Sequence, residues 1–193
     1  SSDLLEQSAE YQYLNEVTVS TVQELIEAIQ NRTKIILKEG VYNFSEIDCD
    51  SIKNPNIDWI RDYEGQTEFT VRNIWNLCLE AEEGARVEIS TENRYARTLA
   101  FEDSQEVTLR GLICGHAVEP GYCTGSVVSL SQCSHITIEN CDLYGCGTYG
   151  IEAYHIFGLT VADTDIYECT YGLIWLSEVE NASFSNCSFL NSE

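Results

Sequence analysis

Two aspartates recur at the same place in successive segments of the chain, and a tyrosine follows each of them two residues later. Asp142 and Tyr144 match Asp165 and Tyr167 at a spacing of 23 residues. If these segments lie side by side in one sheet, their backbones are about 4.8 Å apart. Carboxylates this close repel each other, so one takes up a proton, binds a cation such as Ca²⁺ or turns into water. The alternative is two solvated side chains without a function.

Trp175 and Glu152 form a second candidate pair, because they share one outward position in successive segments. A flat aromatic side chain can stack on a sugar ring, so the pair predicts contact with carbohydrate. The alternative is that Trp175 packs under a loop. His116 is a third candidate, as a general base in a loop, although a lone loop histidine is more often simply solvated. We assign no catalytic residue and no metal ligand from the sequence.

The elements that position these residues follow from a repeat with a period of 23 residues. The segments 136–144, 159–167 and 182–190 superpose residue for residue, and an earlier unit fits at a distance of 29 residues, which indicates an insertion. Each unit contains three short runs in which apolar residues alternate with others, as in strands. A fixed period of this length indicates stacked units that bury their apolar faces against one another.

Three short strands per turn, stacked in parallel, predict an all-β fold: a single-stranded right-handed parallel β-helix. Asn140, Asp163 and Asn186 fall at the same bend of successive turns, where side-chain amides can bond to one another. The pattern resembles the asparagine ladder of the pectate-lyase-like superfamily, with Asp163 and, one turn earlier, Gly111 in place of Asn. This resemblance extends over about residues 18–193. It implies an architecture and leaves the activity open, because the superfamily includes lyases, hydrolases, epimerases and adhesins.

The segment 20–29 has the pattern of a short amphipathic helix, with a capping box formed by Ser20 and Gln23 or by Thr21 and Glu24. In the superfamily that the chain resembles, such a helix covers the N-terminal end of the core. We therefore expect two parts. Residues 1–33 form a loose lead and the capping helix, and residues 34–193 form the β-helix, which we expect to continue beyond residue 193.

Two stretches fit no strand offset and are predicted to be excursions from the coil, namely residues 47–70 and 115–125. Long loops on a rigid scaffold are where function often collects. The arginines in or near these stretches are isolated in the sequence, and Arg110 is expected in a bend.

Acidic residues outnumber basic ones by 32 to 10, and no Lys or Arg follows Arg110. Nucleic acid is therefore not an expected partner, because phosphate binding needs clusters of cations. We expect no membrane span, because no apolar run is long enough. The nine cysteines suit core packing better than zinc binding. Disulfides among Cys114, Cys123 and Cys133 remain open.

The enzymes of the superfamily carry motifs that this chain lacks. Its uronide lyases resemble one another in using a Lys or Arg base, and the regular turns here contain neither. Its pectin-type hydrolases resemble one another in a Gly-His-Gly and an Arg-x-Lys motif, whereas Gly115 and His116 are followed by Ala117 and no Arg-x-Lys occurs. That family's catalytic residues cannot be carried over to this chain.

We therefore predict a non-catalytic recognition or scaffold module that binds carbohydrate or another surface component. The alternatives are the N-terminal part of a polysaccharide lyase or hydrolase and an acidic protein-interaction domain. Neither a cofactor, apart from Ca²⁺ as one option, nor an oligomeric state follows from the sequence. Superfamily habit and four Asn-x-Ser/Thr sites favour export or the cell surface, with any signal peptide outside the sequence. The odd number of cysteines fits a reducing compartment equally well.

Overall fold

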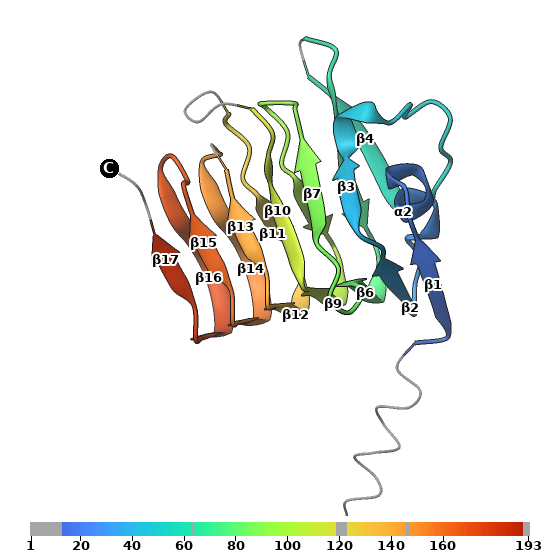
Figure 1. Cartoon of the computed structure of the whole chain (residues 1–193). Coiled ribbons are helices and arrows are strands. Elements are labelled where there is room, and N and C mark those ends of the chain that lie inside the picture. Colours follow the sequence, from blue (N-terminus) through green and yellow to red (C-terminus); the bar gives the residue numbers. More distant parts are fainter. Residues whose placement is uncertain (1–12, 63, 119–122, 146, 191–193) are drawn as a thin grey trace, which may run out of the picture.

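The strands of this protein stack side by side into an elongated coil, from β1 at one end to β17 at the other (Figure 1). The computed structural model describes residues 13–62, 64–118, 123–145 and 147–190 of the 193-residue chain. Within these residues, every strand pairing is parallel except that of β4 with β5. The expectation of a stacked, parallel all-β coil is confirmed.

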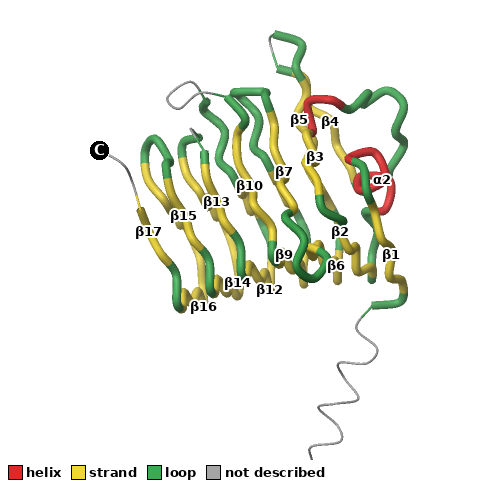
Figure 2. The backbone as a smooth tube through the Cα atoms, viewed as in Figure 1, coloured by secondary structure: helices red, strands yellow, loops and turns green. Residues whose placement is uncertain are grey.

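In the described part of the chain, the strands form two sheets, which Figure 2 shows as two rows of stacked strands. The larger sheet has eleven strands: β1 (Asn15–Val19), β2 (Thr33–Leu37), β4 (Ile57–Arg61), β5 (Thr67–Arg72), β6 (Trp75–Ala81), β8 (Leu99–Glu102), β9 (Gln105–Arg110), β11 (Val128–Ser131), β12 (Ser134–Glu139), β14 (Tyr149–Ala162) and β16 (Gly172–Ser185). The smaller sheet has six: β3 (Gly40–Asn43), β7 (Val87–Thr91), β10 (Leu112–His116), β13 (Asp142–Tyr144), β15 (Asp165–Tyr167) and β17 (Ser188–Leu190).

The long strand β14 shows how a turn of the coil is built. Its first part pairs with β11 and its second part pairs with β12, while β13, which lies between β12 and β14 in the chain, belongs to the smaller sheet. Successive turns are in register at the spacing of 23 residues, so that Ile138 lies beside Val161 and Val161 beside Phe184. Ile138 and Val161 are fully buried, and Phe184, in the last described turn, is partly buried. The predicted file of inward side chains is confirmed.

The bends between strands require a backbone conformation that most residues avoid. Asn140, Asp163 and Asn186 have φ of +51°, +50° and +53°, and Gly111 has φ of +70°. This left-handed region is sterically costly for L-residues and is entered most readily by Gly, Asn and Asp. The recurrence of these residue types is therefore explained by the backbone. The side chains form a ladder only locally, where the Asn186 amide donates to Asp163 Oδ1.

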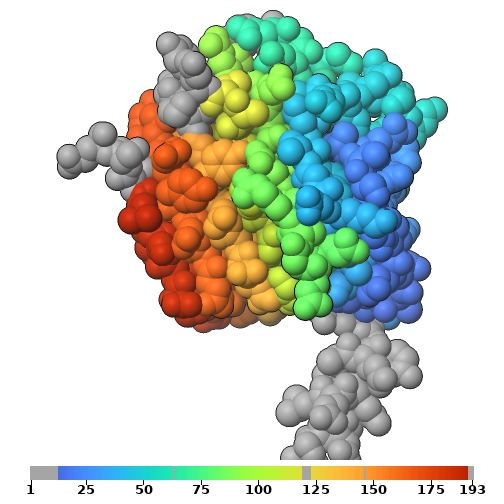
Figure 3. All heavy atoms as spheres, viewed as in Figure 1, coloured from blue at the N-terminus to red at the C-terminus, as the bar shows by residue number. Residues whose placement is uncertain are grey.

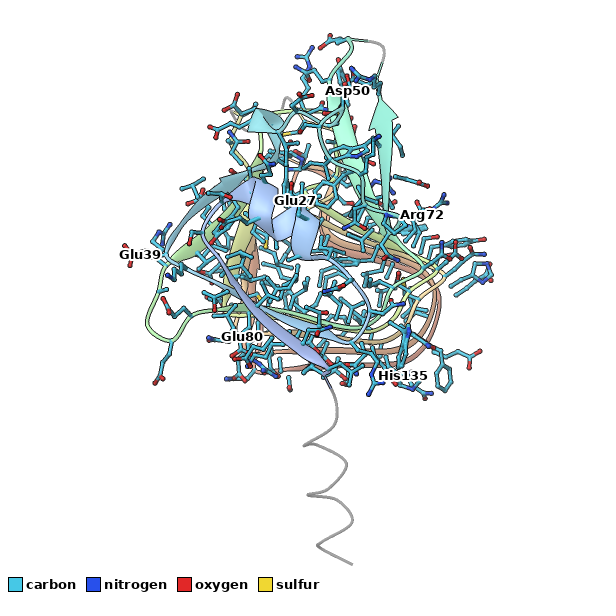
Figure 4. The ribbon with its side chains drawn as sticks, turned by 90° about the vertical axis from the view of Figure 1, so that its right-hand side faces the viewer. Glu27, Glu39, Asp50, Arg72, Glu80 and His135 are labelled. Carbon is cyan, nitrogen blue, oxygen red and sulfur yellow. The ribbon has the colours of Figure 1, made fainter. Side chains whose placement is uncertain are left out.

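The helix α2 (Val22–Ala28) begins as the sequence predicts and is shorter than the segment 20–29. Thr21 accepts a hydrogen bond from the Glu24 amide at 3.2 Å, while the Glu24 carboxylate accepts one from the Ser20 amide at 2.7 Å. The capping box therefore uses Thr21 and Glu24. The view along the coil in Figure 4 shows α2, with Glu27 on it, at the β1 end of the stack. Its residues Leu25 and Ile26 are buried in the core.

Three sequence-based boundaries need correction. β1 pairs with β2, so strand structure begins at Asn15, within the segment predicted as a loose lead; residues 1–12 of that lead lie outside the described residues. Residues 47–70 are not all an excursion, because β5 pairs with β8, which places Val71 beside Phe101 as the next inward position. The excursion predicted for residues 115–125 begins later, because Gly115 and His116 complete β10. In each case tertiary pairing extends a strand beyond its local alternation.

The arginines that look isolated in the sequence are all engaged. Arg110 is the last residue of β9 and forms ion pairs with Glu80 and Glu139 on the flanking strands. Arg72 contacts Asp58 and Glu102 at 2.6 Å each. The placement of Arg110 in a bend was wrong. Parallel stacking brings residues about 30 positions apart into contact, which sequence proximity does not reveal.

The disulfides left open by the sequence are also settled in part. Cys123 is disulfide-bonded, whereas Cys114 and Cys133 are free thiols buried in the core, so the pairing among these three was wrong. Burial raises the pKa of the Cys133 thiol to about 11. Cys146 lies outside the described residues.

Candidate functional site

The outer face of the smaller sheet carries a line of two tyrosines and a glutamate. Tyr144 on β13 lies beside Tyr167 on β15, and their rings stack with centroids 6.0 Å apart at 21°. The Tyr144 hydroxyl donates a 2.7 Å hydrogen bond to Glu88 Oε1 on β7, two strands further along the sheet. We call Glu88, Tyr144 and Tyr167 the tyrosine strip. Figure 3 shows the successive turns of the coil as adjoining bands from blue to red.

The tyrosine strip depends on a glycine in the strand between its two ends. Gly115 on β10 lies beside Tyr144, and a Cβ added to Gly115 would lie 2.7 Å from Tyr144 ring atoms and 2.3 Å from the Tyr144 carbonyl oxygen. The Tyr144 ring therefore rests against the backbone of the neighbouring turn, which allows its hydroxyl to reach Glu88. Any larger residue at position 115 would displace it.

The aspartates that the sequence paired do lie side by side next to the tyrosine strip. Asp142 and Asp165 are in register on β13 and β15 and line a shallow groove of about 440 Å³, together with Asp163 and Arg86. Partial burial, followed by the nearby Asp165 charge, raises the pKa of Asp142, and Arg86 opposes this increase. The groove is therefore a place where a cation or a hydrogen-bond donor of a ligand is favoured.

Trp175 and Glu152 also lie side by side, but in the larger sheet. They are in register on β16 and β14. Trp175 is 38 % exposed and lies near Tyr149, with ring centroids 6.4 Å apart at 33°. The structure thus divides the candidate residues between two faces of the coil: the tyrosine strip with its aspartates on the smaller sheet, and Trp175 with Glu152 on the larger.

The neighbours of Glu152 include a partly buried arginine that sequence reasoning missed. Arg97 forms an ion pair with Glu68 and lies 3.7 Å from Glu102. The charges of Glu68, Glu102 and Glu152 all raise the pKa of Arg97, although the largest single effect, burial, lowers it. This face therefore presents neutralised charges next to Trp175. Arg97 precedes a strand, and only the stacking of turns brings it to Glu152.

His116 does not lie in a solvated loop, and its proposed role as a general base there is corrected. It ends β10, is only 3 % exposed, and shares a 2.8 Å hydrogen bond between its Nε2 and the Ala96 carbonyl. Burial lowers the pKa of the imidazole, and the bond to Ala96 opposes this effect. A neutral ring that donates through Nε2 holds one bend of the coil to the next. His116 is not brought to either binding face.

The structure offers no ready-made metal centre. Within the described residues, no three His, Cys, Asp or Glu side chains are grouped as ligands of one ion. Ca²⁺ prefers six to eight oxygen ligands. An ion held by Asp142 and Asp165 would have to take the others from water or from a bound molecule.

Sequence reasoning found both tyrosines and both aspartates because they repeat, and it missed the residues that do not. Glu88, Arg86 and Tyr149 complete the two faces without recurring at the spacing of 23 residues. The one available signal was the register: Glu88 precedes Ile113 and Asp142 in the same outward row. Following that row back by one more turn would have identified it.

Comparison with known families matches residues 64–193 to the model described as the right-handed beta helix region. The chain belongs to the right-handed β-helix family. The match covers the turns that carry every binding residue considered above. None of the proteins with curated descriptions matches the sequence of this β-helix.

Among solved structures, the β-helix resembles a "putative glycosyl hydrolase" from Parabacteroides merdae ATCC 43184. The TM-score is 0.55, with 9 % sequence identity over 90 % of this chain and 77 % of that one. At this identity the likeness concerns the fold. No described helix of this β-helix is long and apolar enough to cross a membrane.

Proposed function

We propose that this β-helix is a non-catalytic recognition module that binds a polysaccharide along the tyrosine strip. The observation that supports this most directly is the stacked pair Tyr144 and Tyr167, held in register on adjacent turns beside the groove of Asp142 and Asp165. Aromatic rings offer an apolar surface to a sugar ring, and carboxylates accept hydrogen bonds from its hydroxyls. Repetition along the coil suits a ligand that is itself a repeating chain.

The charge of the site narrows the ligand. Three aspartates line the groove and Arg86 is the one cation among its described lining residues, while no Lys or Arg follows Arg110 in the sequence. A polymer of uronic acids would meet repulsion here, because like charges at close range disfavour binding. The polysaccharide we propose is therefore neutral or cationic.

Trp175 and Glu152 provide a second contact surface in this proposal. Trp175 and Tyr149 present a tilted aromatic pair on the larger sheet, beside the carboxylate of Glu152. The description of the Parabacteroides protein agrees with a carbohydrate ligand only as an analogy at the level of the fold.

The test is a depletion assay with a panel of neutral, cationic and uronate-containing polysaccharides. Tyr144→Ala and Tyr167→Ala should each lower the fraction of protein bound to a neutral or cationic polymer, while Tyr154→Ala should leave it unchanged. Tyr154 is a matched control because it is an exposed tyrosine, 40 % accessible, on the larger sheet. Equal losses in all three variants, or tightest binding to a uronate polymer, would refute the proposal.

A second candidate function is glycoside hydrolysis by the same groove. Glycosidases use one protonated and one ionised carboxyl group flanking the scissile bond. Asp142, whose pKa is raised, and its neighbour Asp165 form such a pair. If this function holds, the wild-type chain should release reducing sugar from a bound polymer, and Asp142→Asn should abolish release without abolishing binding. A third candidate, an acidic protein-interaction domain, predicts instead a basic protein partner that is lost as salt rises.

The architecture behind the proposal can be stated more finely than the pairing alone. We infer that each turn has three strand faces, two of which run together in long strands such as β14, and that α2 caps the end of the core. The disulfide at Cys123 favours export to an oxidising compartment, where such bonds persist. A thiol count on the secreted and the cytosolic protein would test the compartment.

A further inference from the structure

The excursion between β3 and β5 encloses a second pocket, which has no relation to the candidate residues from the sequence. It has a volume of about 420 Å³ and lies between the segment after η1 (Phe44–Glu46), the β4–β5 hairpin and the end of β7. Its lining includes Ser45, Cys49, Asp50, Arg61, Gln66 and Glu92. Figure 4 shows Asp50 far out on this excursion, away from Glu80 and His135 on the body of the coil. A volume of this size suits a small ligand.

The walls of the pocket are joined by side-chain contacts. Arg61, at the end of β4, contacts both Asp50 carboxylate oxygens, at 3.2 and 3.3 Å, and the Cys49 sulfur at 3.3 Å. These contacts tie the hairpin to the segment after η1. The pocket therefore keeps its shape through contacts within the chain, as preformed ligand sites do.

The floor of the pocket is fixed in the same way. The Ser45 hydroxyl accepts a 2.8 Å hydrogen bond from the Glu92 amide, and the Asn43 amide donates one of 3.0 Å to Glu92 Oε1. The Asn93 amide donates to the Thr67 carbonyl at 3.3 Å. One side of the Glu92 carboxylate is thus held by the chain, which orients the other oxygen.

The chemistry of the lining points to one class of ligand. Carboxylates of Asp48, Asp50 and Glu92 outnumber the guanidinium of Arg61, so an anionic ligand would be repelled. An apolar ligand would leave these polar groups without partners, which costs free energy. Hydroxyl groups both donate and accept, and therefore match a lining of carboxylates, an amide at Gln66 and a guanidinium. We propose that this pocket binds a single uncharged sugar residue.

Cys49 makes the proposal testable, because it is a free, partly buried thiol in the pocket. The experiment measures the alkylation rate of Cys49 by N-ethylmaleimide, peptide by peptide, in the full chain with glucose, galactose, mannose or xylose added. At least one of these sugars should slow alkylation of Cys49 several-fold. Cys187, a partly buried free thiol in the last described turn, should react at an unchanged rate and is the control.

Two further arms decide the interpretation. Gln66→Ala removes a lining amide at an exchange of little fold risk, and it should remove the protection by sugar while leaving the alkylation rate without sugar unchanged. Glucuronate should protect less than the neutral sugars. The proposal is overturned if none of the four sugars protects Cys49, if glucuronate protects equally well, or if protection survives in Gln66→Ala. None of these outcomes bears on Tyr144 or Tyr167, so the two sites are tested separately.

Discussion

The Tyr144 hydroxyl donates a 2.7 Å hydrogen bond to the Glu88 carboxylate, although 56 residues separate them in the chain. The bond crosses from β13 over β10 to β7, so one side chain ties together three successive strands of the smaller sheet. Because an ionised neighbour disfavours a second negative charge, Glu88 helps burial to raise the pKa of Tyr144. The phenol therefore stays a donor over the whole range in which the protein is folded.

Gly115→Ala should destabilise the protein and disturb the tyrosine strip together. The added Cβ would lie 2.3 Å from the Tyr144 carbonyl oxygen, so the backbones of two turns must separate. Overpacking of this kind costs about 1–3 kcal/mol of unfolding free energy. Urea unfolding followed by circular dichroism would measure it. Gly172→Ala is the matched control, because its new Cβ would meet only the edge of the Tyr149 ring, at 3.3 Å. Equal losses in both variants would contradict this explanation.

Periodicity allowed the repeating part of this fold to be predicted residue by residue. The inward file of Leu109, Ile138 and Val161, and the pairing of Asp142 with Asp165, depend only on a constant offset between turns. In a solenoid each turn contacts mainly its neighbours, so a local pattern carries the tertiary contacts with it. The same reasoning placed Trp175 beside Glu152.

What could not be predicted lies where the offset changes. The hairpin of β4 and β5 lengthens one turn, and this hid the match of Phe69 and Val71 to inward positions. His116 was misplaced because the insertion that follows it hid the end of β10. Contacts such as that of Arg97 with Glu68 depend on side-chain reach across turns, and no spacing in the sequence encodes it.

Trp175→Ala should weaken polysaccharide binding without unfolding the protein, if the larger sheet contributes a contact surface as proposed. The side chain is 38 % exposed and lies near Tyr149, so its removal takes away aromatic surface with little loss of core packing. Trp75→Ala is the control: Trp75 is 39 % exposed, on β6 near the other end of the coil. Affinity electrophoresis in gels containing the bound polysaccharide would compare them. Unchanged mobility of Trp175→Ala would remove the larger sheet from the proposed binding surface.

Asp142→Asn should stabilise the protein near neutral pH. The pKa of Asp142 is raised in the fold by burial and by Asp165, so the folded state holds this proton more tightly than the unfolded chain does. Ionisation at neutral pH therefore opposes folding, and the gain from Asn should vanish as pH falls below the ordinary carboxyl pKa of about 3.9. Asp165→Asn should act in the same direction by removing the repulsion. Urea midpoints at about pH 7 and about pH 3 would test this, and a lower midpoint for Asp142→Asn at neutral pH would argue against it.

His116 should make the fold sensitive to mild acid. Burial lowers its pKa, so the unfolded chain binds a proton at a pH at which the folded state does not. The stability that depends on the neutral ring is complete above the ordinary histidine pKa of about 6.5 and is lost as pH falls through the lower folded value. In His116→Gln the amide can still donate to the Ala96 carbonyl, so unfolding midpoints should depend less steeply on pH between about 7 and 5. His135→Gln, at an exposed position, should follow the wild type. If His116→Gln and the wild type share one pH profile, the ring does not titrate as its burial requires.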